Sequence, residues 1–99
     1  MHPRLRSLPR RTVLDREVPV AVGFRSRLLG LSHLNVSDAG PGLLITRCSS
    51  VHTFGMRFAL DLIFLDEAGG TVALWRAVPP RRLAACRGAA AVLEVPSRW

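Results

Sequence analysis

A single acidic residue lies inside the most apolar segment of this chain, and this combination constrains the fold more than any other feature. Residues 58–65, FALDLIFL, are apolar except for Asp61. A run with apolar residues at both odd and even positions predicts a central β-strand that is covered on both faces. A carboxylate in such a strand is costly to bury unless hydrogen-bond donors reach it. The sequence therefore predicts a polar contact, and with it a candidate site, around Asp61.

The length and composition indicate one small domain. Single domains cluster near about 100–150 residues, and this chain has 99, of which 48% are hydrophobic. Residues 1–11 combine prolines with arginines, so we predict a basic flexible leader there and a single domain over residues 12–99. No segment approaches the roughly 20 apolar residues of a membrane span, and none follows the N-terminus as in a secretory signal. Cys48 and Cys86 lie far apart without a metal-type doublet, so we expect reduced thiols and a cytoplasmic protein.

The positive charge of the chain comes from arginine alone. There are 14 basic residues and no lysine, and the formal net charge is +7. Several of the arginines lie near the N-terminus, where a basic arm can bind phosphates through counterion release. No aromatic residue lies among them to stack on bases. We therefore expect a solvated tail, and nucleic-acid binding through this arm is an alternative.

The hydrophobic periodicity predicts a mainly β fold with one short α-helix. A helical period occurs only in residues 24–34, where Gly30 predicts a close approach to the sheet. The predicted buried face of this helix consists of Phe24, Leu28, Leu31 and Leu34. About five or six strands are expected in a sandwich or open barrel. They fall within residues 12–22, 42–46, 58–65, 71–76 and 89–95.

Two features concern the edges of the predicted sheet. Pro19 has no backbone N–H, so its strand should lie at an edge or contain a bulge. The final strand, residues 89–95, is expected to leave an exposed edge. Such an edge would allow a second copy to pair, so both a monomer and a dimer are compatible with the sequence.

Several short motifs occur together in a fixed order. They are RLLGL at Arg27–Leu31, GLLI at Gly42–Ile45, HTFGMRFALD at His52–Asp61, IFLD at Ile63–Asp66, then Gly70, Val72, Pro80 and VLE at Val92–Glu94. Over about Val20 to Pro96, this combination resembles the domain-of-unknown-function family 192 (DUF192), a group of small, mostly prokaryotic proteins. The resemblance implies a compact, β-sandwich-like fold and no established activity. Ala59 stands where the family usually has proline, which predicts a less rigid start of the central strand.

Polar side chains are concentrated in the turn before the central strand. The candidate binding residues there are His52, Thr53, Met56 and Arg57, together with Asp61 in the strand. In one interpretation His52, Arg57 and Asp61 frame a small pocket, and Asp61 holds one tautomer of His52. In the other interpretation Asp61 accepts hydrogen bonds from the HTFG turn and only stabilises it.

The last apolar run and the cysteines provide further candidates. Glu94 ends that run, and we expect it to approach the acid of the central strand or to pair with an arginine at the rim. Cys48 and His52 have a C-x3-H spacing that Cys86 or His33 would have to complete, which is too sparse to predict zinc. We therefore predict neither a metal nor a cofactor.

Three functions are compatible with these residues. We favour a non-catalytic binding or interaction module that recognises a small anionic ligand or a protein through the His52–Arg57 turn. The second function is a hydrolase or acid–base enzyme that uses His52 and Asp61. The third is nucleic-acid binding through the basic N-terminal arm.

Overall fold

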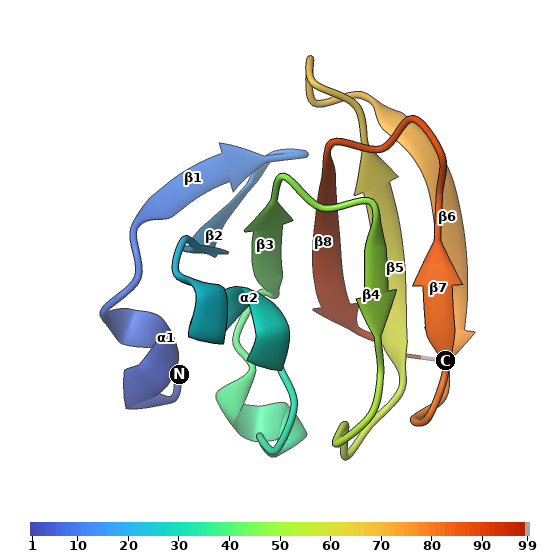
Figure 1. Ribbon diagram of the computed structural model, residues 1–99. Helices are drawn as coiled ribbons and strands as arrows, with labels where there is room; N and C mark the ends of the chain where they lie inside the picture. The colour runs from blue at the N-terminus through green and yellow to red at the C-terminus, as the bar shows by residue number, and fades with distance from the viewer. Residues whose placement is uncertain (99) are drawn as a thin grey trace.

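The structure, a computed structural model that describes residues 1–98, contains eight strands in two sheets and only short helices (Figure 1). The larger sheet has six strands in the order β1-β2-β3-β8-β5-β6, and β4 and β7 pair separately. The fold is therefore mainly β with open sheets, as predicted. The elements are α1 (Pro3–Arg6), β1 (Arg10–Val13), β2 (Arg16–Ala21), α2 (Phe24–Leu29), the 3-10 helix η1 (Val36–Asp38), β3 (Leu43–Thr46), β4 (Ser50–His52), β5 (Leu60–Leu65), β6 (Thr71–Val78), β7 (Leu83–Ala85) and β8 (Ala91–Pro96).

The last strand lies inside the larger sheet. β8 is antiparallel to β3 on one side and to β5 on the other, and Glu94 is opposite Leu43 and Leu62. The expectation of an exposed edge at this strand is therefore wrong; the edge strands of the six-stranded sheet are β1 and β6. Because the strand order depends on pairing between distant segments, position in the sequence was a poor guide to position in the sheet.

The two faces of the six-stranded sheet are covered unequally. We call the face that carries Leu60, Leu62 and Phe64 the front face; these side chains are buried, as is Val92 of β8. On β5, Asp61 and Ile63 point to the back face and are only half-buried. The predicted central position of this strand is confirmed, whereas complete coverage of both faces is not.

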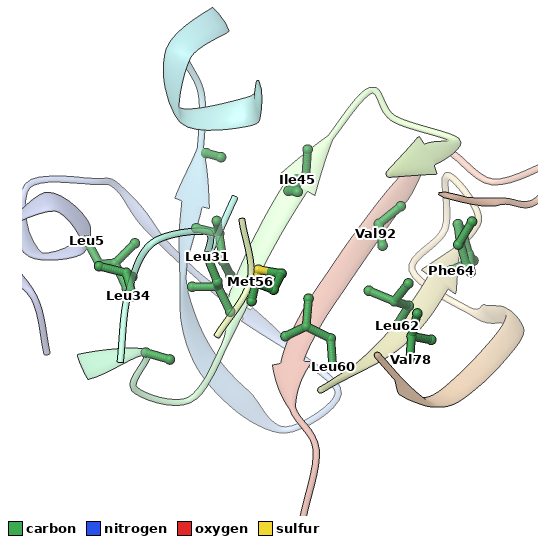
Figure 2. Packing of buried hydrophobic residues seen from close by; sticks show 14 residues of the cluster. Leu5, Leu31, Leu34, Ile45, Met56, Leu60, Leu62, Phe64, Val78 and Val92 are labelled. Carbon is green, nitrogen blue, oxygen red and sulfur yellow. The ribbon is translucent and has the colours of Figure 1, made fainter. Parts of the chain in front are cut away.

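A second layer covers the front face. It consists of α2, β4 and β7, which lie on the same side of the six-stranded sheet (Figure 1); we call it the front layer. Leu31, Leu34 and Met56 pack into the same core cluster as the front-face side chains of the sheet (Figure 2). The short strands β4 and β7 were not predicted, because each has three residues and its only strand partner in residues 1–98 is the other.

Helix α2 is shorter than predicted and exposes part of the predicted buried face. It ends at Leu29, and Gly30 forms its C-cap. Phe24 is 81% exposed and Leu28 is 54% exposed, whereas Leu31 and Leu34 are buried beyond the helix end. The assignment of Phe24 and Leu28 to the core is therefore wrong, because the helical period does not continue past Gly30.

The N-terminal residues pack against the domain, in contrast to the loose leader predicted from their composition. Leu5 of α1 is buried in the main core cluster, beside Leu34 (Figure 2). The guanidinium of Arg4 donates to the carbonyl oxygens of Gly30, at 2.7 Å, and Ser32, at 3.2 Å. These contacts attach the segment to the end of α2.

The first two strands form a hairpin; strand was predicted within residues 12–22, and the structure begins it at Arg10. Leu14 and Asp15 make its turn and both have positive φ angles. Pro19 is opposite Arg10 of β1, and pairing of β2 with β3 begins only at Val20. β2 is not an edge strand, but its proline lies where the strand has a partner on one side only.

No helix within residues 1–98 combines the length and the hydrophobicity needed to traverse a lipid bilayer.

Replacing Leu5 by alanine tests the packing of the N-terminal segment. Loss of a buried leucine side chain should lower the free energy of unfolding by about 2–5 kcal/mol. Leu14→Ala is the matched control, because Leu14 is exposed and its truncation should change stability by less than about 0.5 kcal/mol. Urea denaturation would measure both variants, and equal midpoints would show that residues 1–11 do not contribute to the core.

Candidate functional site

A small cavity lies between the front layer and the six-stranded sheet. Its volume is about 120 Å³, and residues 27–30, Ile45, residues 50–52 and Glu94 line it. The walls therefore come from α2, β3, β4 and β8. These separate elements meet only in the tertiary structure. Two of the candidate residues, His52 and Glu94, meet at this cavity.

Glu94 is the buried acid of this structure. Only 2% of its surface is exposed, because β8 is central and its side chain points to the front face beneath α2. Its Oε1 accepts a hydrogen bond from the backbone N–H of Leu31 at 3.2 Å. Burial raises the pKa of Glu94 to about 7, and the hydrogen bond from Leu31 opposes this shift. The expected salt bridge at the rim is therefore wrong: no ion pair with Glu94 is formed within residues 1–98.

Gly30 permits the close approach of α2 to Glu94. Its φ angle is +55° and its ψ angle is −130°, a conformation that L residues with a side chain rarely adopt. A Cβ atom at this position would lie 2.6 Å from Oε1 of Glu94. The close approach predicted from Gly30 is confirmed, and the backbone turn after α2 delivers the N–H of Leu31 to the carboxylate.

Arg27 fixes the end of α2 over the cavity. Its Nε donates to the carbonyl oxygen of Thr46 at 3.1 Å, and its Nη2 donates to that of Arg47 at 2.7 Å. Both acceptors lie at the end of β3. The guanidinium thus joins the helix to the sheet through carbonyl oxygens that would otherwise need water.

His52 contributes a nitrogen atom that has no partner. Its Nε2 lies 3.1 Å from the carbonyl oxygen of Leu28. A carbonyl oxygen can only accept, so this contact requires a proton on Nε2, and Nδ1 of the neutral ring is then an acceptor. Nδ1 is buried and has no hydrogen-bond partner within residues 1–98.

The other residues of the HTFGMR turn serve the fold. The hydroxyl of Thr53 donates to the carbonyl oxygen of Pro79 at 2.7 Å and accepts from the N–H of Arg82 at 2.8 Å. Met56 is buried in the core. Arg57 is exposed and donates to Oδ1 of Asn35 at 2.9 Å. None of these three side chains lines the cavity of Glu94 and His52.

Asp61 lies on the back face, away from His52. Its Oδ1 accepts a hydrogen bond from the N–H of Ala77 at 2.9 Å, where β6 has an irregular register and Ala77 a positive φ angle. It lines a different hollow, which also contains Arg16 and Arg98. Adjacent residues of a strand point to opposite faces, so the side chain of Asp61 cannot share the front-face cavity. The structure therefore brings together neither Asp61 with His52 nor Asp61 with the donors of the HTFG turn.

The sequence signal that pointed to Asp61 also applies to Glu94. Residues 91–95 read AVLEV, so Glu94 is likewise an acid within an apolar strand. The apolar run around Asp61 is the longer one, so the sequence favoured Asp61 over Glu94. Burial of an acidic side chain, however, depends on which face of the sheet is covered. Within residues 1–98, no three His, Cys, Asp or Glu side chains are grouped closely enough to hold a metal ion.

The two sheets make this a small, mainly β, single-domain protein, and within residues 1–98 it contains one buried carboxylate. The chain belongs to the family DUF192, described as "Uncharacterized ACR", whose model matches residues 7–99. This result confirms the resemblance seen in the sequence motifs. The family has no established function.

Two crystal structures have the same fold. One is a protein of unknown function from Novosphingobium aromaticivorans DSM 12444, with a TM-score of 0.72 and 13% identity over 99% of this chain and 88% of that chain. The other, from Sinorhizobium meliloti 1021, is provisionally described as a transcription regulator; its TM-score is 0.70, with 21% identity over 89% of this chain and 78% of that chain. At such identities the likeness concerns the fold alone. Among curated protein sequences, none matches this chain.

Replacing Gly30 by alanine tests the contact between α2 and β8. The strained backbone and the displaced carboxylate should together lower the free energy of unfolding by at least about 2 kcal/mol. Gly23→Ala is the control, because its added Cβ would meet no atom within 4 Å, and its cost should stay below about 1 kcal/mol. Thermal or urea denaturation gives both values. Similar losses for the two variants would contradict the close contact.

The pH dependence of stability tests the burial of Glu94. Its pKa is about 7 in the folded protein, compared with an ordinary value of 4.5. Between these values only the folded state keeps the proton, so stability should fall by about 3 kcal/mol as the pH rises from about 4.5 to 7. Glu94→Gln keeps an oxygen for the N–H of Leu31 and cannot ionise. This variant should lack that part of the pH dependence and should exceed the wild type in stability at pH 8.

Glu67→Gln is the matched control, because Glu67 is exposed in the β5–β6 hairpin. Its denaturation curves at pH 5, 6, 7 and 8 should follow those of the wild type. If the profile of Glu94→Gln also follows the wild type, the carboxylate of Glu94 is solvated and its burial is contradicted.

Proposed function

We propose that this protein is a non-catalytic binding module whose small ligand occupies the cavity between α2 and β8. The observation that supports this proposal is a buried nitrogen without a partner, Nδ1 of His52, at the same cavity as the buried carboxylate of Glu94. Glu94 receives one hydrogen bond from residues 1–98, and Nδ1 of His52 receives none. Buried polar atoms nearly always have partners, and an unpaired one costs about 1–3 kcal/mol. A ligand that donates to both groups would remove this cost.

The acceptors define the chemistry of the ligand. Nδ1 of His52 is an acceptor because Nε2 holds the proton, and an ionised Glu94 accepts only. The ligand therefore presents N–H or O–H donors, as in a primary amide or an ammonium group. This class differs from the anion expected from the sequence, because Arg57 lies outside the cavity and the guanidinium of Arg27 is engaged by β3.

The volume limits the size of the ligand. A water molecule takes up about 30 Å³ in the liquid, so the 120 Å³ of the cavity correspond to a ligand of a few non-hydrogen atoms. The remaining lining is largely apolar, with Leu28, Leu29 and Ile45. A compact ligand with one donor group and a short apolar part fits this lining.

Ligand binding can be tested by two-dimensional NMR of the ¹⁵N-labelled protein. Acetamide, urea and methylammonium are the donor probes, and acetate and acetone are the acceptor-only probes. Donor probes should shift the amide signals of Leu31 and His52 in a saturable way. Glu94→Gln and His52→Phe should each weaken the response about tenfold or more, since each removes one acceptor. Glu67→Gln is the control and should respond like the wild type.

Two outcomes of this experiment would contradict the proposal. One is that no donor probe shifts the signals of Leu31 and His52. The other is that the shifts persist with equal affinity in both cavity variants. Denaturation curves of each variant would show that the protein remains folded, so that a lost response reflects the site.

A second candidate function is acid–base catalysis by Glu94 and His52. The pKa of Glu94, about 7, is close to the value at which a carboxyl group exchanges protons well at neutral pH. The dyad differs from the one expected in the sequence, because Asp61 lies on the opposite face. Turnover of a probe that disappears in Glu94→Gln but persists in Asp61→Asn would favour catalysis over binding.

The cytoplasmic location expected from the sequence remains a proposal.

A further inference from the structure

The front layer and the loops around it contain arginines but no acidic residue. The seven acidic residues of the chain all fall outside residues 18–37, 39–60 and 68–93. These three segments contain α2, β4 and β7, and they carry eight of the arginines. Among these arginines, Arg25 and Arg27 lie on α2, and Arg81, Arg82 and Arg87 lie on either side of β7.

The exposed aromatic side chains lie on the same side. Phe24, Phe54 and Trp75 are 81%, 50% and 41% exposed. Phe24 begins α2, and the ring of Phe54, just after β4, lies 5.9 Å from that of His52. Trp75 of β6 is opposite Leu62 and its ring is 6.2 Å from that of Phe64, which places it on the front face.

Arginines occur close in the chain or in the fold to the residues that carry these rings. Arg25 follows Phe24 on α2. The backbone N–H groups of Arg81 and Arg82 both bond to Thr53, the neighbour of Phe54, at 3.2 and 2.8 Å. Trp75 shares a shallow surface hollow with Arg82 and Leu83. Exposed rings and arginines therefore occur on the same elements, α2 and the segments next to β4 and β7, and on the neighbouring strand β6.

We propose that this face binds single-stranded nucleic acid, with the arginines at the phosphates and the aromatic rings stacked on bases. Proteins that bind single strands without sequence preference combine these two features. A duplex offers its phosphates but keeps its bases stacked, so the rings favour a single strand. This face adjoins the cavity of Glu94, because the ring of Phe54 lies near that of His52, but binding to it does not depend on the proposed small ligand.

A labelled oligothymidylate of about 16 nucleotides is a suitable probe, because single-strand sites usually span about 4–16 nucleotides. Fluorescence anisotropy would measure its affinity for the intact chain over a range of salt concentrations. Phe24→Ala and Phe54→Ala should each weaken binding about tenfold. Leu14→Ala, which truncates an exposed apolar side chain on the β1–β2 turn, is the control and should have no effect.

The arginines are tested through the salt dependence. Arg25→Gln and Arg82→Gln should each reduce the slope of log K against log salt by about 0.7. Arg11→Gln on β1 is the control and should leave the slope unchanged. In a Trp99→Phe background, the fluorescence of Trp75 should be quenched when the oligonucleotide binds, which reports stacking directly.

Three results would overturn this inference. The first is no binding of the oligonucleotide at about 50 mM salt, where electrostatic contacts are strong. The second is equal losses for Arg11→Gln and Arg82→Gln with no effect of the phenylalanine variants, which would show unspecific charge attraction. The third is displacement by polyglutamate together with insensitivity to both phenylalanine variants, which would instead indicate an acidic protein partner. Because Phe24, Phe54 and the substituted arginines are exposed, melting temperatures of these variants should remain close to the wild type.

Discussion

Contact between a glycine and a buried carboxylate determines how the front layer sits on the sheet. Gly30 ends α2 in a conformation that only glycine adopts easily, and the missing side chain leaves room for Glu94. The turn then directs the N–H of Leu31 to the carboxylate. Arg27 holds the same helix end to β3, and Arg4 holds the residues that follow it. The helix is short, so these polar contacts position it more than its own apolar face does.

The cavity follows from this arrangement. Because α2 is held at its C-terminal end, the carbonyl oxygen of Leu28 faces β4 and accepts a hydrogen bond from Nε2 of His52. The other ring nitrogen, Nδ1, is buried and has no hydrogen-bond partner within residues 1–98. A carboxylate with a pKa near 7 lines the same small space. The fold thus retains two polar groups at some cost in stability, as is common at binding and catalytic sites.

The sequence offers two acids within apolar strands, and the structure places them on opposite faces of the sheet. An acid within an apolar strand is the feature that Asp61 and Glu94 share. Asp61 points to the half-covered back face and bonds to β6, whereas Glu94 points beneath α2. Only the sheet order decides between them, because it places β8 in the centre and α2 over one face. His52 lines the same cavity as Glu94, which is more than forty residues away in the sequence.

Local features of the sequence determined the mainly β class, the central strand β5 and the need for glycine at position 30. Each of these depends on periodicity or turn chemistry within a few residues. Tertiary structure alone decided the pairing of β4 with β7, the interior place of β8 and the exposure of Phe24 and Leu28. These features depend on which distant segments meet. The free energy of such contacts comes from burial and strand pairing between those segments, which a local sequence pattern does not indicate.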